Sequence, residues 1–161
     1  MRLALFAVSI LATACTASLP PAAPAPLVPF NAQEVAWVNT PGTATVEGQA
    51  FMKTRGGDVK YGAGEDVWLI PNSAHSFDWY SRLTSRYGDS QVKKMDPQLA
   101  ALVRKTVAGG DGRFRFESVP AGPYLILTSV TWLAGRSQQG GFVGTTAQAE
   151  NGKTVNIIVT R

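Results

Sequence analysis

The chain has 161 residues, with 15 Lys and Arg against 11 Asp and Glu, one His and one Cys, and its formal net charge is +4. A single cysteine excludes an intramolecular disulfide. A single histidine argues against the histidine-containing ligand sets of catalytic zinc sites. The length suffices for one domain with its own hydrophobic core.

Residues 1–14 are predicted to form a signal peptide. Arg2 precedes an apolar run to Ala14, which is too short for a membrane-spanning helix of about 20 residues. Small residues then precede Cys15, and the arrangement resembles a bacterial lipoprotein signal. Leu11 lies one position further from Cys15 than is usual in such signals, and Ala12 with Ala14 also fits the A-x-A pattern of ordinary cleavage.

The lipoprotein resemblance implies that Cys15 carries acyl chains that hold the protein to a membrane. Thr16, rather than an aspartate, follows Cys15, which by the same resemblance implies the outer membrane of the cell envelope. The alternative is a soluble periplasmic protein. Cleavage would remove Arg2 and leave a net charge of +3, from 14 Lys and Arg against 11 Asp and Glu.

Residues 15–43 are predicted to form a tether. Five prolines in the segment 16–29 favour an extended, semi-rigid spacer that buries little of its surface. The folded domain is then expected to cover residues 44–161.

Most of the domain is predicted to be β-structure. Phe114 and Phe116 alternate with charged residues, which is the period of a half-buried strand. Asn151-Gly152 is a strong hairpin signal and predicts that its flanking segments pair antiparallel. The expected strands lie near residues 45–52, 67–71, 113–119, 122–132, 142–150 and 153–161.

A two-helix insertion is predicted at about residues 76–108. The first helix places Trp79, Tyr80, Leu83 and Tyr87 on one face. The second is expected to begin at an Asp96 N-cap followed by Pro97 and to stop at Gly109. His75 is expected to be exposed at the start of the insertion.

The segment from Asp111 to Tyr124 closely matches the pattern D-G-x-F-x-F-x-x-[VL]-P-x-G-x-Y. Together with VEGQAF and VWLIP, it resembles carboxypeptidase regulatory-like domains. The resemblance implies a mainly β fold, a transthyretin-like or immunoglobulin-like antiparallel β-sandwich, from about Ala44 to Arg161. These motifs mark strands and turns and do not indicate a reaction.

The sequence contains few of the motifs that are typical of catalytic or cofactor-binding sites. The glycines between Thr54 and Gly64 lead into an expected strand and lack G-K-[ST], so they predict a link between strands rather than a phosphate loop. There is no G-x-S-x-G elbow, and the C-terminal Tyr-Arg-Gly-Ser of transthyretin-like hydroxyisourate hydrolases is missing. The acidic residues have no EF-hand spacing; they include Asp58, Glu65, Asp66 and Asp111. We therefore expect a non-catalytic protein without cofactor or metal.

The function that this favours is a binding or structural module for an envelope partner, either a protein or a glycan, and not for nucleic acid. Basic residues and a tyrosine of the first loop and of the insertion form the candidate contact surface: Lys53, Arg55, Lys60, Tyr61, Arg82, Arg86, Lys93 and Lys94. The alternative is a carbohydrate- or peptidoglycan-binding module that stacks sugars on Tyr61, Trp79, Tyr80 or Trp132. A weaker alternative is an accessory to an enzyme on a separate chain.

Overall fold

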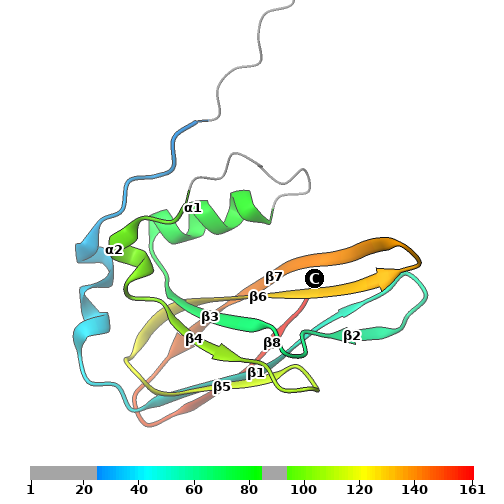
Figure 1. The fold of residues 1–161 in the computed structure, drawn as a ribbon. Coiled ribbons are helices and arrows are strands. Elements are labelled where there is room, and N and C mark those ends of the chain that lie inside the picture. The colour runs from blue at the N-terminus through cyan, green and yellow to red at the C-terminus, as the bar shows by residue number, and fades with distance from the viewer. Residues whose placement is uncertain (1–24, 85–93) are drawn as a thin grey trace, which may run out of the picture.

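The structure is a computed structural model that describes residues 25–84 and 94–161. The predicted signal peptide, Cys15, Arg86 and Lys93 lie outside these residues. Two β-sheets pack face to face, and two short α-helices lie over one of them (Figure 1). The predicted mainly β sandwich with two helices is confirmed.

The first sheet is built around one central strand. This strand pairs antiparallel with two others and parallel with the C-terminal strand. The strands of this sheet are β1 (Ala44–Lys53), β2 (Val59–Tyr61), β5 (Arg113–Val119) and β8 (Thr154–Val159). In β5 the alternation predicts the faces correctly, since Phe114 and Phe116 are buried while Arg113 and Arg115 are exposed.

The second sheet supplies a strand that is buried on both faces. Its order is β4 (Arg104–Val107), β3 (Asp66–Pro71), β6 (Gly122–Ala134) and β7 (Ser137–Ala149). Tyr124, Ile126 and Val130 of β6 face the first sheet, whereas Leu125 and Leu127 face the helices. Two covered faces explain why this stretch of β6 is nearly continuously apolar.

The predicted second helix is shorter than expected. Helix α1 (Ala74–Leu83) begins with a capping box at Ser73 and buries Trp79. Helix α2 (Pro97–Ala100) begins at Asp96, whose carboxylate accepts from the N–H of Gln98 at 2.8 Å. It ends at Ala100, and Arg104–Val107 form strand β4 instead, because their backbone groups pair with β3. Pairing at a sheet edge overrides the weak helical pattern of this segment.

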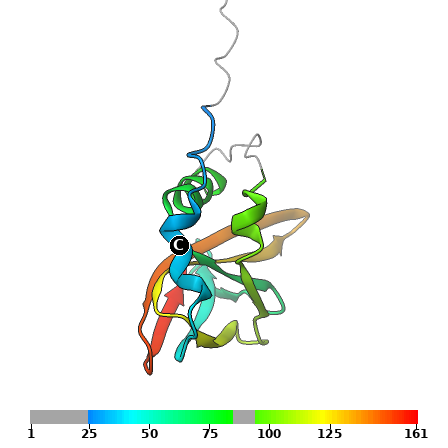
Figure 2. The same cartoon turned by 90° about the vertical axis from the view of Figure 1, so that its left-hand side faces the viewer.

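The segment before β1 packs against the sandwich. Its 3₁₀-helix η1 (Ala32–Asn39) runs beside the sheets, as Figure 2 shows, and buries Val35. The Trp37 ring lies 5.0 Å from that of Tyr124 and edge-on to it. Burial raises the pKa of Tyr124 to about 12. Several residues of the predicted tether between Ala25 and Asn39 thus contact the domain, while β1 starts at the predicted boundary, residue 44.

His75 is buried, and the expectation that it is exposed was wrong. Its Nδ1 lies 2.5 Å from the Val28 carbonyl, to which it donates, and its Nε2 accepts from the N–H of Asp96 at 3.2 Å. The ring therefore joins the N-terminal segment, α1 and the start of α2. The spacing of apolar residues along α1 gives no sign of partners that lie so far away in the sequence.

The predicted hairpin at Asn151-Gly152 is also wrong. β7 pairs with β6, and β8 pairs in parallel with β1, so the turn crosses from one sheet to the other. Thr43 holds this turn: its N–H donates to Asn151 Oδ1 at 3.2 Å, and its Oγ1 accepts from the N–H of Gly152 at 2.9 Å. The local turn chemistry was predicted correctly, but it does not determine which strand each flanking segment joins.

Candidate functional site

A cleft of about 450 Å³ lies between the turn that joins β1 to β2 and the end of the β6–β7 hairpin. We call it the hairpin-tip cleft. In Figure 1 these hairpins project at the right-hand end, and the described N-terminal segment lies at the other end. The cleft is lined by Thr54, Arg55, Gly56, Trp132, Ala134 and Gln139.

Arg55 lies in the turn that joins β1 to β2. The N–H of Thr54 donates to the Asp58 carbonyl at 2.8 Å, and the N–H of Asp58 donates to Thr54 Oγ1 at 3.1 Å. Gly57 supplies the positive φ of 93° that the turn requires. These bonds fix the backbone on both sides of Arg55, whose side chain is exposed.

Trp132 forms the aromatic wall of the cleft. It follows Val130 on the same face of β6 and lies beside its cross-strand partner, Gln139, near the end of the hairpin. A β-carbon at Gly140 would lie 2.9 Å from Cζ3 of the indole and 2.0 Å from the Val130 carbonyl oxygen. The glycine therefore leaves room for the ring, which is partly exposed.

These groups suit a sugar ligand. An indole face offers an apolar surface with a polarised π-system for C–H groups. A hydroxyl, a guanidinium and an amide offer donors and acceptors for sugar hydroxyls. Thr54, Arg55 and Gln139 supply these three groups on the rim of the same cleft.

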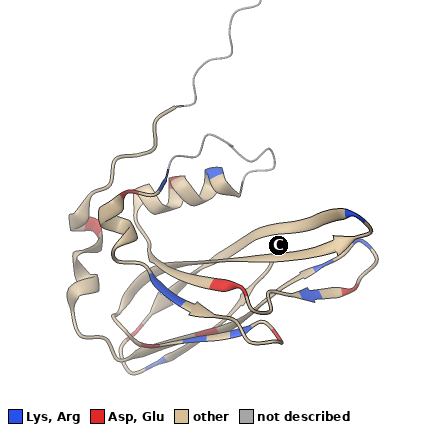
Figure 3. Ribbon diagram, viewed as in Figure 1, with Lys and Arg blue, Asp and Glu red and all other residues tan. Residues whose placement is uncertain are grey.

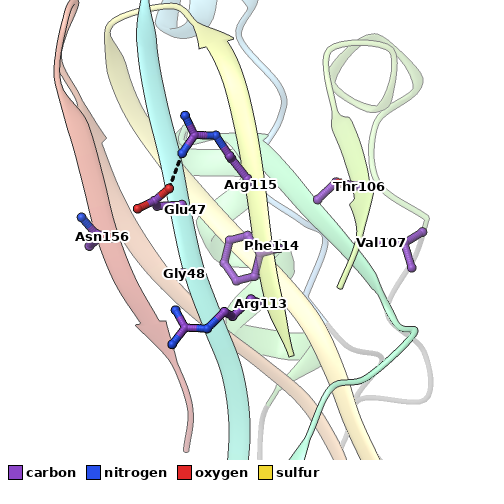
Figure 4. A pocket seen from close by; sticks show the side chains of 8 residues that line it. All are labelled: Glu47, Gly48, Thr106, Val107, Arg113, Phe114, Arg115 and Asn156. Atoms are coloured by element: carbon purple, nitrogen blue, oxygen red, sulfur yellow. Dashed lines mark hydrogen bonds and ion pairs between the residues drawn. The ribbon is translucent and has the colours of Figure 1, made fainter. Parts of the chain in front are cut away.

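A second hollow, of about 410 Å³, lies over β1, β5 and β8 and reaches Thr106 and Val107 of β4 (Figure 4). Its two cations are already paired: Arg115 with Glu47 and, at 2.9 Å, with Glu117, and Arg113 with Asp111 at 3.1 Å. The hydrogen bond that Arg115 donates to the Glu117 carboxylate is the main cause that raises the pKa of Arg115. Phe114 is the only aromatic residue in its lining among those that the structure describes, and its ring is buried, so the described part of the hollow presents no stacking surface.

A third cavity, of about 280 Å³, lies between the second sheet and the helices and includes Trp68 and Trp79. Lys105 Nζ already lies 5.4 Å from the Trp68 ring centroid. Apart from that ammonium and the indole groups, the lining side chains are apolar. The cavity therefore offers fewer partners to sugar hydroxyls than the hairpin-tip cleft does.

The structure separates the predicted contact residues. Lys60 pairs with Met52 and lies on the inner face of its hairpin, while Tyr61 pairs with Phe51 on the outer face and is 44% exposed. Lys53 and Lys94 are exposed. Of the members of this predicted set that the structure describes, only Arg55 lines the hairpin-tip cleft.

Arg82 is engaged within the fold. It pairs with Asp78 at 2.9 Å and also donates to the carbonyls of Ala25 and Pro26. Its hydrogen bond is the main cause that lowers the pKa of Asp78, which in turn accepts from the N–H of Val28 at 3.0 Å. The pair holds the N-terminal segment against α1.

The predicted aromatic platforms differ in accessibility. Trp132 lines the cleft, whereas Trp79 is 9% exposed, and the hydroxyl of Tyr80 donates to the Gly144 carbonyl at 3.2 Å. Gln139 was not predicted as a site residue, because Ser137–Gly141 contain none of the usual strand formers. The available signal was Gly135-Arg136, a two-residue turn with Gly135 at φ 62°.

Two further observations concern metals and membranes. Within residues 25–84 and 94–161, no group of three His, Cys, Asp or Glu is arranged to hold a metal ion. Among the helices of the same residues, none has both the length and the apolar character needed to cross a membrane.

Comparison with known proteins shows that this fold also occurs in a solved structure. No protein-family model and no curated protein matches the sequence. The fold is similar to the crystal structure of a Pseudomonas aeruginosa protein described as a "putative carbohydrate binding protein". The two are 25% identical, with a TM-score of 0.76, and the match covers 84% of this chain and all of the other. Membership of the carboxypeptidase regulatory-like family stays a prediction.

Proposed function

We propose that the protein is a carbohydrate-binding module that holds a glycan in the hairpin-tip cleft. The observation that carries the proposal is a partly exposed Trp132 in one cleft with the polar groups of Thr54, Arg55 and Gln139. The description of the structural relative supports it. The binding is non-catalytic in this proposal, which agrees with the lack of recognisable catalytic motifs.

A fluorescence titration tests the proposal. Peptidoglycan fragments and a panel of polysaccharides are added to the protein, and tryptophan emission is followed. A sugar that stacks on Trp132 should change the emission of the wild type, and Trp132→Phe should lose most of this response. Trp68→Phe is the matched control and should keep it, because Trp68 lies in a different cavity. A response lost with Trp68 rather than Trp132 would place the sugar elsewhere.

We further propose that the module acts in the cell envelope, held by a lipid on Cys15. The hairpins whose residues line the cleft lie at the far end of the domain from the described N-terminal segment (Figure 1), so an anchor attached through that segment would leave the cleft open. In detergent phase separation of cells that express it, the wild type should enter the detergent phase and Cys15→Ser should not. Recovery of the wild type in the aqueous phase would instead favour a soluble periplasmic protein.

A further inference from the structure

Positive charge is concentrated at the two hairpin tips. Residues 53–61 and 132–139 contain Lys53, Arg55, Lys60 and Arg136 but only one carboxylate, Asp58, which gives a net charge of +3. The remaining described residues contain eight cations and nine anions. Figure 3 shows the basic residues at the right-hand ends of both hairpins. The tips are thus the basic end of a domain that is otherwise close to neutral.

The side chains of these four cations do not pair with other described parts of the fold. Within residues 25–84 and 94–161, none of them forms an ion pair or a side-chain hydrogen bond. The other described cations are mostly engaged with carboxylates, backbone carbonyls or an aromatic ring: Arg82, Arg104, Lys105, Arg113, Arg115 and Lys153. Six of the twelve described cations are engaged in this way, whereas the four at the tips are not, which leaves those four available for an external anion.

Their placement connects them to the hairpin-tip cleft. Arg55 lines it, and Arg136 occupies the turn directly after Ala134, which also lines it. Lys60 lies on the inner face of its hairpin, toward the second sheet, whereas Lys53 lies on the outer face. Arg55 and Arg136 therefore come from the two opposing hairpins, and both are exposed.

We infer that the glycan taken by the cleft is acidic, carrying carboxylate, sulfate or phosphate groups. The inference rests on the proposed function, since it assigns a ligand class to the same site. Guanidinium groups bind carboxylates and phosphates through two parallel hydrogen bonds. A basic patch beside a cleft also raises the local concentration of anions. Trp132 holds a sugar ring while Arg55 and Arg136 hold its acidic groups.

The test compares oligogalacturonate with its methyl ester, which has the same sugar ring without the charge. By isothermal titration calorimetry, the wild type should bind the acid at least about tenfold more tightly, and added salt should weaken only the binding of the acid. The double variant Arg55→Gln/Arg136→Gln should bind both forms about equally. Lys94→Gln/Lys153→Gln removes the same charge outside the tips and should keep the preference.

Three outcomes would overturn the inference. The first is equal affinity of the wild type for acid and ester. The second is a preference that survives in the tip variant. The third is binding of anionic phosphatidylglycerol vesicles without binding of oligogalacturonate or dextran sulfate, which would assign the tips to a membrane surface. If a neutral glycan alone changes Trp132 emission, the acidic ligand class fails while the proposed function stands. If no glycan changes it, the proposed function itself fails.

Discussion

Trp132→Ala is expected to weaken glycan binding by roughly 10- to 100-fold. Loss of an aromatic anchor from a binding site costs on the order of 1.5–3 kcal/mol, and each 1.4 kcal/mol is about tenfold in affinity. Among residues 25–84 and 94–161, Trp132 is the only aromatic residue that lines the hairpin-tip cleft, so no other described ring can replace it there. Isothermal titration calorimetry with a glycan found in the fluorescence titration measures the effect.

Two variants make this result specific to Trp132. Trp132→Phe keeps a ring and should lose less affinity than the alanine variant. Tyr61→Ala removes a more exposed aromatic side chain from the outer face of the neighbouring hairpin and should bind as the wild type does. Unchanged binding by Trp132→Ala, with thermal unfolding showing a folded domain, would exclude the cleft as the site.

Gly48→Ala is expected to destabilise the domain by about 1–3 kcal/mol, as overpacking in a well-packed interior does. Gly48 lies in β1 between β5 and β8. An added β-carbon would lie 2.3 Å from the carbonyl oxygen of Ile157 and 3.0 Å from Cζ of Phe114. A backbone oxygen cannot move aside as a side chain can, so β1 and β8 would have to separate. Urea denaturation measures the change in the free energy of unfolding.

Gly110→Ala is the matched control. A β-carbon at Gly110 meets no atom within 4 Å, so this variant should change the free energy of unfolding by less than about 0.5 kcal/mol. If Gly48→Ala were as stable as Gly110→Ala, β8 could not lie as close to β1 as the structure places it.

The features that the sequence predicted correctly are local. The alternation of Phe114 and Phe116 identifies both β5 and its buried face, and the Asp96-Pro97 pair identifies the start of α2. Each depends on neighbours a few residues away. Gly48, in the middle of a strand, is also typical of a close approach of another backbone, although the sequence does not say that β8 makes it.

The features that could not be predicted depend on segments far apart in the chain. Arg104–Val107 form a strand because β3 offers an open edge, and β8 crosses to β1 although its turn would also suit a hairpin. His75 is buried because the N-terminal segment and Asp96 close over it. Arg55 and Trp132 were both proposed as contact residues, but on different grounds. Only the packing of the two sheets shows that they line one cleft.

The most direct test of the hairpin-tip cleft is a map of chemical-shift changes in ¹H–¹⁵N spectra during titration with a bound oligosaccharide. We expect the largest changes at the amides of residues 54–56 and 132–139 and at the indole N–H of Trp132. Changes confined to Glu47, Arg113 and Arg115, in the hollow over the first sheet, or to Trp68 and Trp79, would contradict this expectation.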